Sequence, residues 1–179
     1  MSDYPRTIDN GGGELLTFSE PVAGQQKATN VVSPGSGPPM HVHHLQEESL
    51  TVDSGIMGWQ REGEEEQIAH AGETVTFPPG DIHRFWNAGE EELVCSGYVR
   101  PPHNVEYFLT KVYESMRATG GKRPRMFDAA YLLTRYRSEF GMTEIPAPVQ
   151  RFIFPVVLWL GKLRGLDKRF ADAPEPVRR

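Results

Sequence analysis

The chain has 179 residues, of which 38% are hydrophobic and 10% aromatic, and its formal net charge is -5. This length accommodates one domain with an appendage, and this composition is sufficient for a buried core, which excludes an intrinsically disordered chain. The charge is unevenly spread: residues 1–104 carry 5 Lys and Arg against 16 Asp and Glu, whereas residues 105–179 carry 14 against 8. The acidic part argues against nucleic acid as a partner, because phosphate repels it.

The cellular compartment is predicted from three features. The single cysteine, Cys95, lies in an apolar run and cannot form an intrachain disulfide, which fits a reducing compartment. The first residues show no basic region followed by an apolar one, as a signal peptide would. The longest apolar run, Phe152 to Leu160, is shorter than the roughly 20 residues that a membrane-spanning helix needs. We expect a cytoplasmic protein without a membrane span.

Residues 1–12 are expected to be a loose lead-in to a series of short strands. Turns rich in Gly, Pro and Asp separate the strand-like runs, a pattern typical of an antiparallel sandwich or barrel. The runs are ELLTF (14–18), QKATNVV (26–32), SLTVD (49–53), GIMGWQ (55–60), ETVTF (73–77), HRFWN (83–87) and LVCSGYV (93–99). Together they predict a mainly β domain over residues 13–103, with the acidic run at 62–66 as a solvated hairpin tip.

Helical periodicity replaces strand alternation in residues 104–179, which predict a helical extension. The expected helices run from the N-cap Asn104 to Gly120-Gly121, over about 127–140 with Gly141 as a stop, and over about 148–164 with a kink at Pro155. The third helix is apolar all round, so we expect it to be buried against the barrel or a partner subunit. A homodimer is therefore predicted, and contact with a membrane surface is the alternative.

A cluster of histidines begins at His41. Side chains alternate along a strand, so His41 and His43 point to the same side, whereas His44 points to the other. Glu47 has the even offset from His43 on one straight strand. If the chain bends before the next strand, however, Glu48 shares the inward face with the apolar side chains that follow it. A buried carboxylate is costly unless it is paired or bound to a metal, which favours Glu48 over Glu47.

A second cluster, GETVTFPPGDIHRFWN, spans residues 72–87. His83 follows a Pro-Pro-Gly-Asp turn and shares its strand face with Phe85 and Asn87. Three imidazoles and one carboxylate suit one divalent first-row metal ion (Fe, Mn, Ni, Cu or Zn) and leave one or two coordination positions open. The alternative is that the histidines are surface residues of a β protein.

These residues match both signature motifs of the cupin superfamily, which the chain resembles. The first, G-x5-H-x-H-x3,4-E-x6-G, matches Gly35, His41, His43, Glu48 and Gly55, and the second, G-x5-P-x-G-x2-H-x3-N, matches Gly72, Pro78, Gly80, His83 and Asn87. The resemblance implies a double-stranded β-helix, or jelly-roll barrel, over about residues 13–100. It also implies a metal held by His41, His43, Glu48 and His83, and structural roles for Pro78, Gly80 and Asn87. The helical extension departs from the minimal barrel and is similar to a subset of bacterial cupins.

Several functions remain open at this point. The most concrete is a metal-dependent oxidoreductase of the dioxygenase type acting on a small organic molecule, with Glu48 also accepting a proton. Met57, Trp59 and Phe85 are the candidate pocket-lining residues. An isomerase or lyase with the same metal, or a non-catalytic module that binds a small molecule or metal, is the alternative, because one fold supports many chemistries. The sequence does not decide whether the chain is an enzyme.

Overall fold

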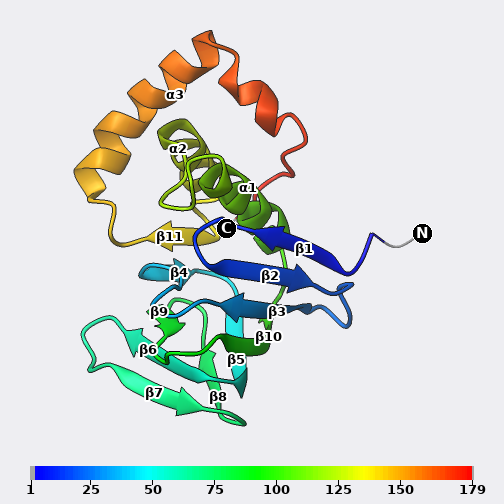
Figure 1. The fold of residues 1–179 in the computed structure, drawn as a ribbon. Coiled ribbons are helices and arrows are strands. Elements are labelled where there is room, and N and C mark those ends of the chain that lie inside the picture. Colours follow the sequence, from blue (N-terminus) through cyan, green and yellow to red (C-terminus); the bar gives the residue numbers. More distant parts are fainter. Residues whose placement is uncertain (1–2, 179) are drawn as a thin grey trace.

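The computed structural model describes residues 3–178, which form a β-sheet domain followed by a helical region (Figure 1). The strands are β1 (Arg6–Asp9), β2 (Glu14–Phe18), β3 (Gln26–Val32), β4 (His41–His43), β5 (Glu47–Ser54), β6 (Ile56–Arg61), β7 (Gln67–His70), β8 (Thr74–Phe77), β9 (Ile82–Asn87), β10 (Leu93–Arg100) and β11 (Phe140–Met142). The helices are α1 (Val105–Arg117), α2 (Met126–Arg135), a π-helical turn (Val149–Ile153), α3 (Phe154–Leu163) and a 3-10 helix (Leu166–Phe170).

The strands form two antiparallel sheets that pack into a jelly-roll barrel, as the sequence predicts. Within the described residues, one sheet has the order β1-β2-β3-β10-β5-β8 and the other β11-β4-β9-β6-β7. The barrel core includes Val52, Met57 and Leu93, each with 0% of its surface exposed. Burying a side chain of this size contributes about 1.5–3 kcal/mol to stability. Cys95 lies in the same core, and burial raises the pKa of its thiol to about 12.

All seven expected strands are present, because the turns between them carry the residues that tight turns require. The acidic run at 62–66 is the connection of the β6–β7 hairpin, as predicted. Residues of the expected lead-in form β1, which pairs with β2. The strands β7 and β11 were not predicted, since QIAH is short and FGM was assigned to the end of a helix.

The first helix lies over the strands at the start of the barrel. Tyr113 of α1 packs against Leu16 and Phe18 of β2, and α1 is beside β1 and β2 in Figure 1. Asn104 occupies the N-cap position of this helix, as predicted, but its side chain makes no capping hydrogen bond. Its amide instead donates to the buried carboxylate of Glu139, which lies after α2.

The prediction that the second helix continues to residue 140 is wrong. α2 ends at Arg135, and Gly141 lies in β11, where it pairs with Val42 of β4. The Glu139 carboxylate fixes this departure from the helix, since it accepts hydrogen bonds from Asn104, Gln46 and the backbone N–H of Val177. β11 thereby extends the sheet that carries β4.

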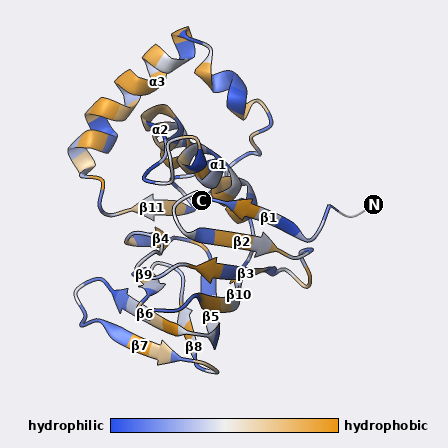
Figure 2. Cartoon of the chain, viewed as in Figure 1, coloured by the Kyte–Doolittle hydropathy of each residue, from blue (hydrophilic) through white to orange (hydrophobic). Residues whose placement is uncertain are grey.

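The third helical segment changes from a π-helical turn to α3 next to Pro155, where the sequence predicts a kink. Proline lacks the N–H that an α-helix needs, and the chain forms a π-helical turn before α3 begins, with Pro155 in its first turn. α3 packs against α2, where Gly161 leaves room for the Phe127 ring. The opposite face is exposed and strongly apolar, which Figure 2 shows as orange along α3. The large exposed side chains of the π-helical turn and α3 are Phe152, Ile153, Val156, Trp159, Leu160 and Leu163.

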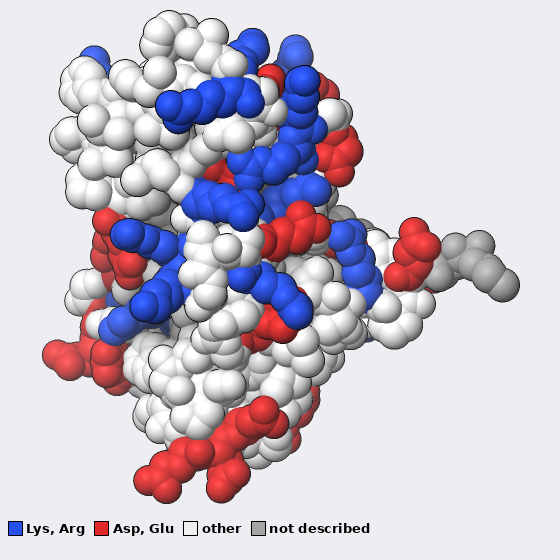
Figure 3. Space-filling view, turned by 45° about the horizontal axis from the view of Figure 1, so that its top comes forward, with Lys and Arg blue, Asp and Glu red and all other residues white. Residues whose placement is uncertain are grey.

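Charge is distributed between the two regions as the sequence indicates. Lys and Arg gather over the helical region, whereas Asp and Glu gather at the far end of the barrel (Figure 3). Some of the basic side chains pair within the helical region itself, as Lys111 and Arg169 do with Asp172 and Asp128. Among residues 3–178, no helix has both the length and the apolar character to cross a membrane.

Candidate metal centre

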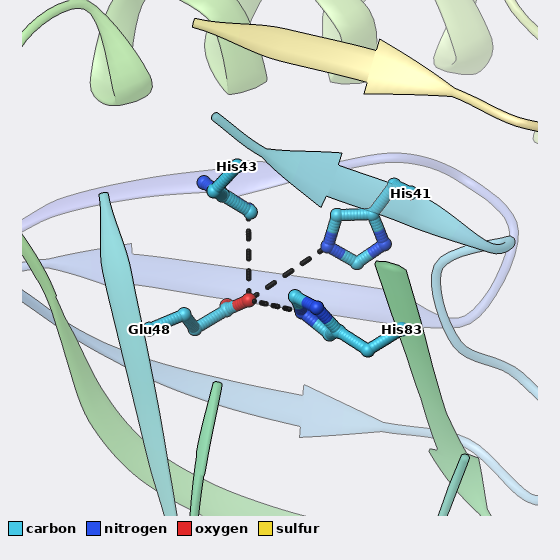
Figure 4. Close-up of side chains that lie close together, drawn as sticks. All are labelled: His41, His43, Glu48 and His83. Carbon is cyan, nitrogen blue, oxygen red and sulfur yellow. Dashed lines mark hydrogen bonds and ion pairs between the residues drawn. The ribbon is translucent and has the colours of Figure 1, made fainter. Parts of the chain in front are cut away.

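Four side chains from three strands meet inside the barrel. β4 directs His41 and His43 to the same side, and its pairing with β9 sets His41 opposite His83. Glu48 comes from β5 and points at the three imidazoles, where the dashed lines of Figure 4 converge on its carboxylate. The Nε2 atoms of His41, His43 and His83 lie 3.7, 3.5 and 2.9 Å from Glu48 Oε2.

Glu48, rather than Glu47, lies with the histidines, as the alternation argument predicts. Glu47 projects from the other face of β5, where its carboxylate accepts the Tyr98 hydroxyl at 2.8 Å and pairs with Arg100 at 2.8 Å. His44 is outside the group, so the structure brings together the four residues that the motifs imply.

Backbone carbonyls orient two of the imidazoles. His41 Nδ1 is 2.8 Å from the carbonyl oxygen of Pro39, and His83 Nδ1 is 3.0 Å from that of Asp81. A carbonyl oxygen only accepts, so each Nδ1 carries the proton and each Nε2 is directed to the centre. The carboxylate of Asp81 pairs instead with Arg61 at 2.8 Å, so Asp81 supports His83 through its backbone.

The electrostatics of the group favour a bound cation. Burial lowers the pKa of His43 to about 3, which keeps this imidazole neutral. Burial alone would raise the pKa of Glu48, but the attraction of the neighbouring His41, His43 and His83 outweighs it and holds the pKa well below its usual value. For His41, burial acts to lower the pKa, but the neighbouring Glu48 carboxylate prevails and raises it.

The donor set fits a metal ion. One ligand atom from each of the four residues lies within 4.8 Å of the others. At His83, an acceptor oxygen faces each ring nitrogen, because Asp81 O faces Nδ1 and Glu48 Oε2 faces Nε2. A proton or a metal ion must therefore lie between Nε2 and the carboxylate. Three imidazole nitrogens and one carboxylate oxygen suit a divalent first-row ion, and the geometry does not select which one.

A large cavity adjoins this group. Its volume is about 1500 Å³, and His41, His43 and Glu48 form part of its wall. Much of the rest is apolar and comes from β2, β3 and β10 of the barrel and from α1 and α2. The helical region therefore encloses space that the barrel alone would leave open.

The three candidate pocket residues lie in different surroundings. Phe85 borders the cavity and is also part of the barrel core. Met57 is completely buried in that core. Trp59 packs against the core and makes a T-shaped contact with the Phe77 ring.

Polar residues that the sequence analysis missed also border the cavity. They are Glu14, Asn30 and Tyr113, and each is less than a tenth exposed. Glu14 could have been found, because it shares the inward face of ELLTF with Leu16 and Phe18, the same signal that identified Glu48. Tyr113 gives no such signal, since its position depends on how α1 packs on the barrel.

Comparisons with known proteins place the barrel in a family. Residues 29–97 match the family model described as "Cupin domain". Two fungal proteins are similar: "Oxidoreductase iacF" of Pestalotiopsis fici, 32% identical over 45% of this chain and 40% of its own length, and "Probable oxidoreductase virH" of Hypocrea virens, 31% identical over 37% and 31%. The chain thus spans less than half the length of these relatives. A cupin-like protein from Thermotoga maritima of known structure is 26% identical, with a TM-score of 0.46, over 50% of this chain and 70% of its own.

The matched segment contains all four candidate metal ligands and both signature motifs in full. The strands that carry these motifs form the expected jelly roll. Residues 29–97 of this chain therefore form a cupin domain.

Proposed function

We propose that the chain is a metal-dependent oxidoreductase that acts on a small organic molecule, with chemistry of the dioxygenase type. The observation that carries this proposal is the convergence of three imidazoles and one carboxylate beside a largely apolar cavity, whose wall includes His41, His43 and Glu48. The oxidoreductase names of the two fungal relatives support it.

In this proposal His41, His43, Glu48 and His83 hold the metal. A bound first-row ion supplies open coordination positions and redox or Lewis-acid chemistry. The carbonyls of Pro39 and Asp81 keep two imidazoles in the tautomer that ligation requires. The apolar walls limit access of water, and the ionised Glu48 carboxylate accepts a proton from the substrate.

Oxygen consumption tests this proposal. Protein loaded separately with Fe, Mn, Ni, Cu or Zn would be screened against phenolic and keto-acid compounds. We expect uptake with at least one metal, loss of uptake in His43→Ala, and its retention in His44→Ala, since His44 lies outside the ligand group. Metal-dependent turnover without oxygen uptake would instead indicate an isomerase or lyase, and metal binding without turnover a binding module.

We also propose that the chain forms a homodimer through the exposed face of α3. That face carries large apolar side chains, of which Trp159 is 63% and Leu163 68% exposed. Contiguous apolar surface of this kind on a helix is typical of an interface. Burial of the face by a second copy would remove it from water while leaving the cavity within each subunit.

A further inference from the structure

The cavity wall holds a second polar group besides the candidate metal ligands. Glu14 of β2, Asn30 of β3 and Tyr113 of α1 border the same cavity, and they are 7%, 6% and 7% exposed. They come from both the barrel and the helical region, so the group exists only because α1 lies over the first strands.

Hydrogen bonds hold the Glu14 carboxyl in place. Its Oε1 accepts from Asn10 Nδ2 at 2.8 Å, and its Oε2 accepts from the Tyr113 hydroxyl at 3.0 Å and from Asn30 Nδ2 at 3.5 Å. Burial raises the pKa of this carboxyl, and the three hydrogen bonds offset only part of that effect. Glu14 thus has donors on both oxygens.

Asn30 is different, because one of its polar atoms has no partner. Its Oδ1 is buried without a hydrogen bond to any described residue. The amide cannot simply be turned round, since that would direct Oδ1 at the carboxylate of Glu14 and lose the donor that Nδ2 supplies. A buried acceptor without a donor is unfavourable. We therefore expect this oxygen to accept a hydrogen bond from a group that is not part of the chain.

Strand pairing does not require a polar side chain at this position. On the inner face of β3, Asn30 is flanked along the strand by Ala28 and Val32, and its partners on the adjacent strands are Leu16 and Cys95. Strand pairing uses only the backbone of Asn30. An apolar residue would fill the same position without leaving an unpaired acceptor.

We propose that Asn30 Oδ1 recognises a hydroxyl or N–H group of the compound that the cavity holds, with Glu14 and Tyr113 as positioning residues. The compound is an uncharged, largely apolar small molecule with one such donor, because the surrounding wall is mainly apolar. This inference deepens the proposed function, since it concerns the substrate of the same cavity.

A matched pair of probes tests the assignment: 2-naphthol, which has a hydroxyl donor, and 2-methoxynaphthalene, which keeps the ring and oxygen but lacks the donor. Their binding to the full-length protein would be measured by calorimetry, both after chelator treatment and after metal loading. We expect 2-naphthol to bind about tenfold more tightly in both states, a ratio equivalent to roughly 1.4 kcal/mol. A crystal of the metal-free complex should show its hydroxyl within hydrogen-bond distance of Asn30 Oδ1.

Variants separate recognition from a structural role. Asn30→Leu should abolish the preference for 2-naphthol. If that variant does not fold, Asn30→Ala, which adds no bulk, is measured in its place and should also abolish the preference. Tyr113→Phe should weaken the preference by releasing Glu14. The control is Gln26→Leu on the same strand, where the buried amide already donates to the carbonyl of Ser19, and the preference should persist.

The assignment is overturned if the two probes bind equally, if neither binds, or if the preference survives removal of the Asn30 side chain. Because the preference is read in metal-free protein, this failure is distinct from failure of the proposed function. Oxygen uptake without the preference would remove only the Asn30 assignment. The preference without any metal-dependent reaction would remove only the proposed oxidation.

Discussion

Replacement of Glu48 by Gln provides a sharp test of the metal centre, because it changes charge and leaves size almost unchanged. Glu48 Oε2 lies within 3.7 Å of the Nε2 atoms of all three histidines, so its carboxylate is the only anionic member of the group. A neutral amide would attract a divalent cation less strongly and would direct either an oxygen or an N–H donor at the site.

The expected loss of metal affinity is large. Removing an outer partner of a metal ligand typically lowers affinity by about 10–100-fold. Loss of a charged ligand should exceed that range, so we expect Glu48→Gln to bind metal more than about 100-fold less tightly, or by more than roughly 2.7 kcal/mol. Glu47→Gln is the matched control, since it changes the neighbouring carboxylate on the opposite strand face. That variant loses only a partly exposed ion pair, which costs about 1 kcal/mol or less in stability.

Competition with a chelator of known affinity would measure metal binding by both variants, and circular dichroism would establish that both are folded. We expect severe loss of metal binding in Glu48→Gln and unchanged binding in Glu47→Gln. Equal affinity of Glu48→Gln and the parent protein, or a selective loss in Glu47→Gln, would refute the assignment of Glu48 to the inner face.

Three further predictions concern pH, packing and assembly. The free energy of unfolding of metal-free protein should fall as pH decreases from 6.5 toward 3, because in that window the unfolded chain protonates His43 and the folded chain does not. Denaturant titrations should show a shallower fall in His43→Phe, and an identical fall would contradict the lowered pKa. Gly161→Ala should lower the free energy of unfolding by about 1–3 kcal/mol, because the added Cβ would clash with the Phe127 ring, whereas metal binding should be retained. Thermal unfolding measures this loss, and an unchanged melting temperature would show that α3 does not pack there. Light scattering should find a dimer that Trp159→Glu with Leu163→Glu converts to a folded monomer, and a dimer that survives these changes would exclude the α3 face.

The barrel could be predicted from the sequence because its strands are short, alternate in polarity and end in turns. The same alternation placed His41, His43 and Glu48 on one side. Their closeness to His83 depends on the pairing of β4 with β9, for which the strand pattern alone gives no register. The two complete motifs supplied that link through the family resemblance.

The helical region was less predictable because tertiary contacts override its local pattern. Residues 136–140 continue a helical periodicity, but the buried Glu139 carboxylate and the pairing of β11 with β4 take the chain out of the helix. The group of Glu14, Asn30 and Tyr113 is equally invisible locally. Glu14 and Asn30, 16 residues apart, meet through the pairing of β2 with β3, and Tyr113, 99 residues from Glu14, joins them only when α1 covers the barrel.

Anomalous diffraction tests the central claim most directly. Crystals of untagged protein loaded separately with Fe, Mn, Ni, Cu or Zn would be measured on both sides of the absorption edge of each metal. For at least one of these metals, we expect an anomalous peak within bonding distance of the Nε2 atoms of His41, His43 and His83 and of the Glu48 carboxylate. No peak with any of the five metals, or a peak held by other residues, would contradict this claim.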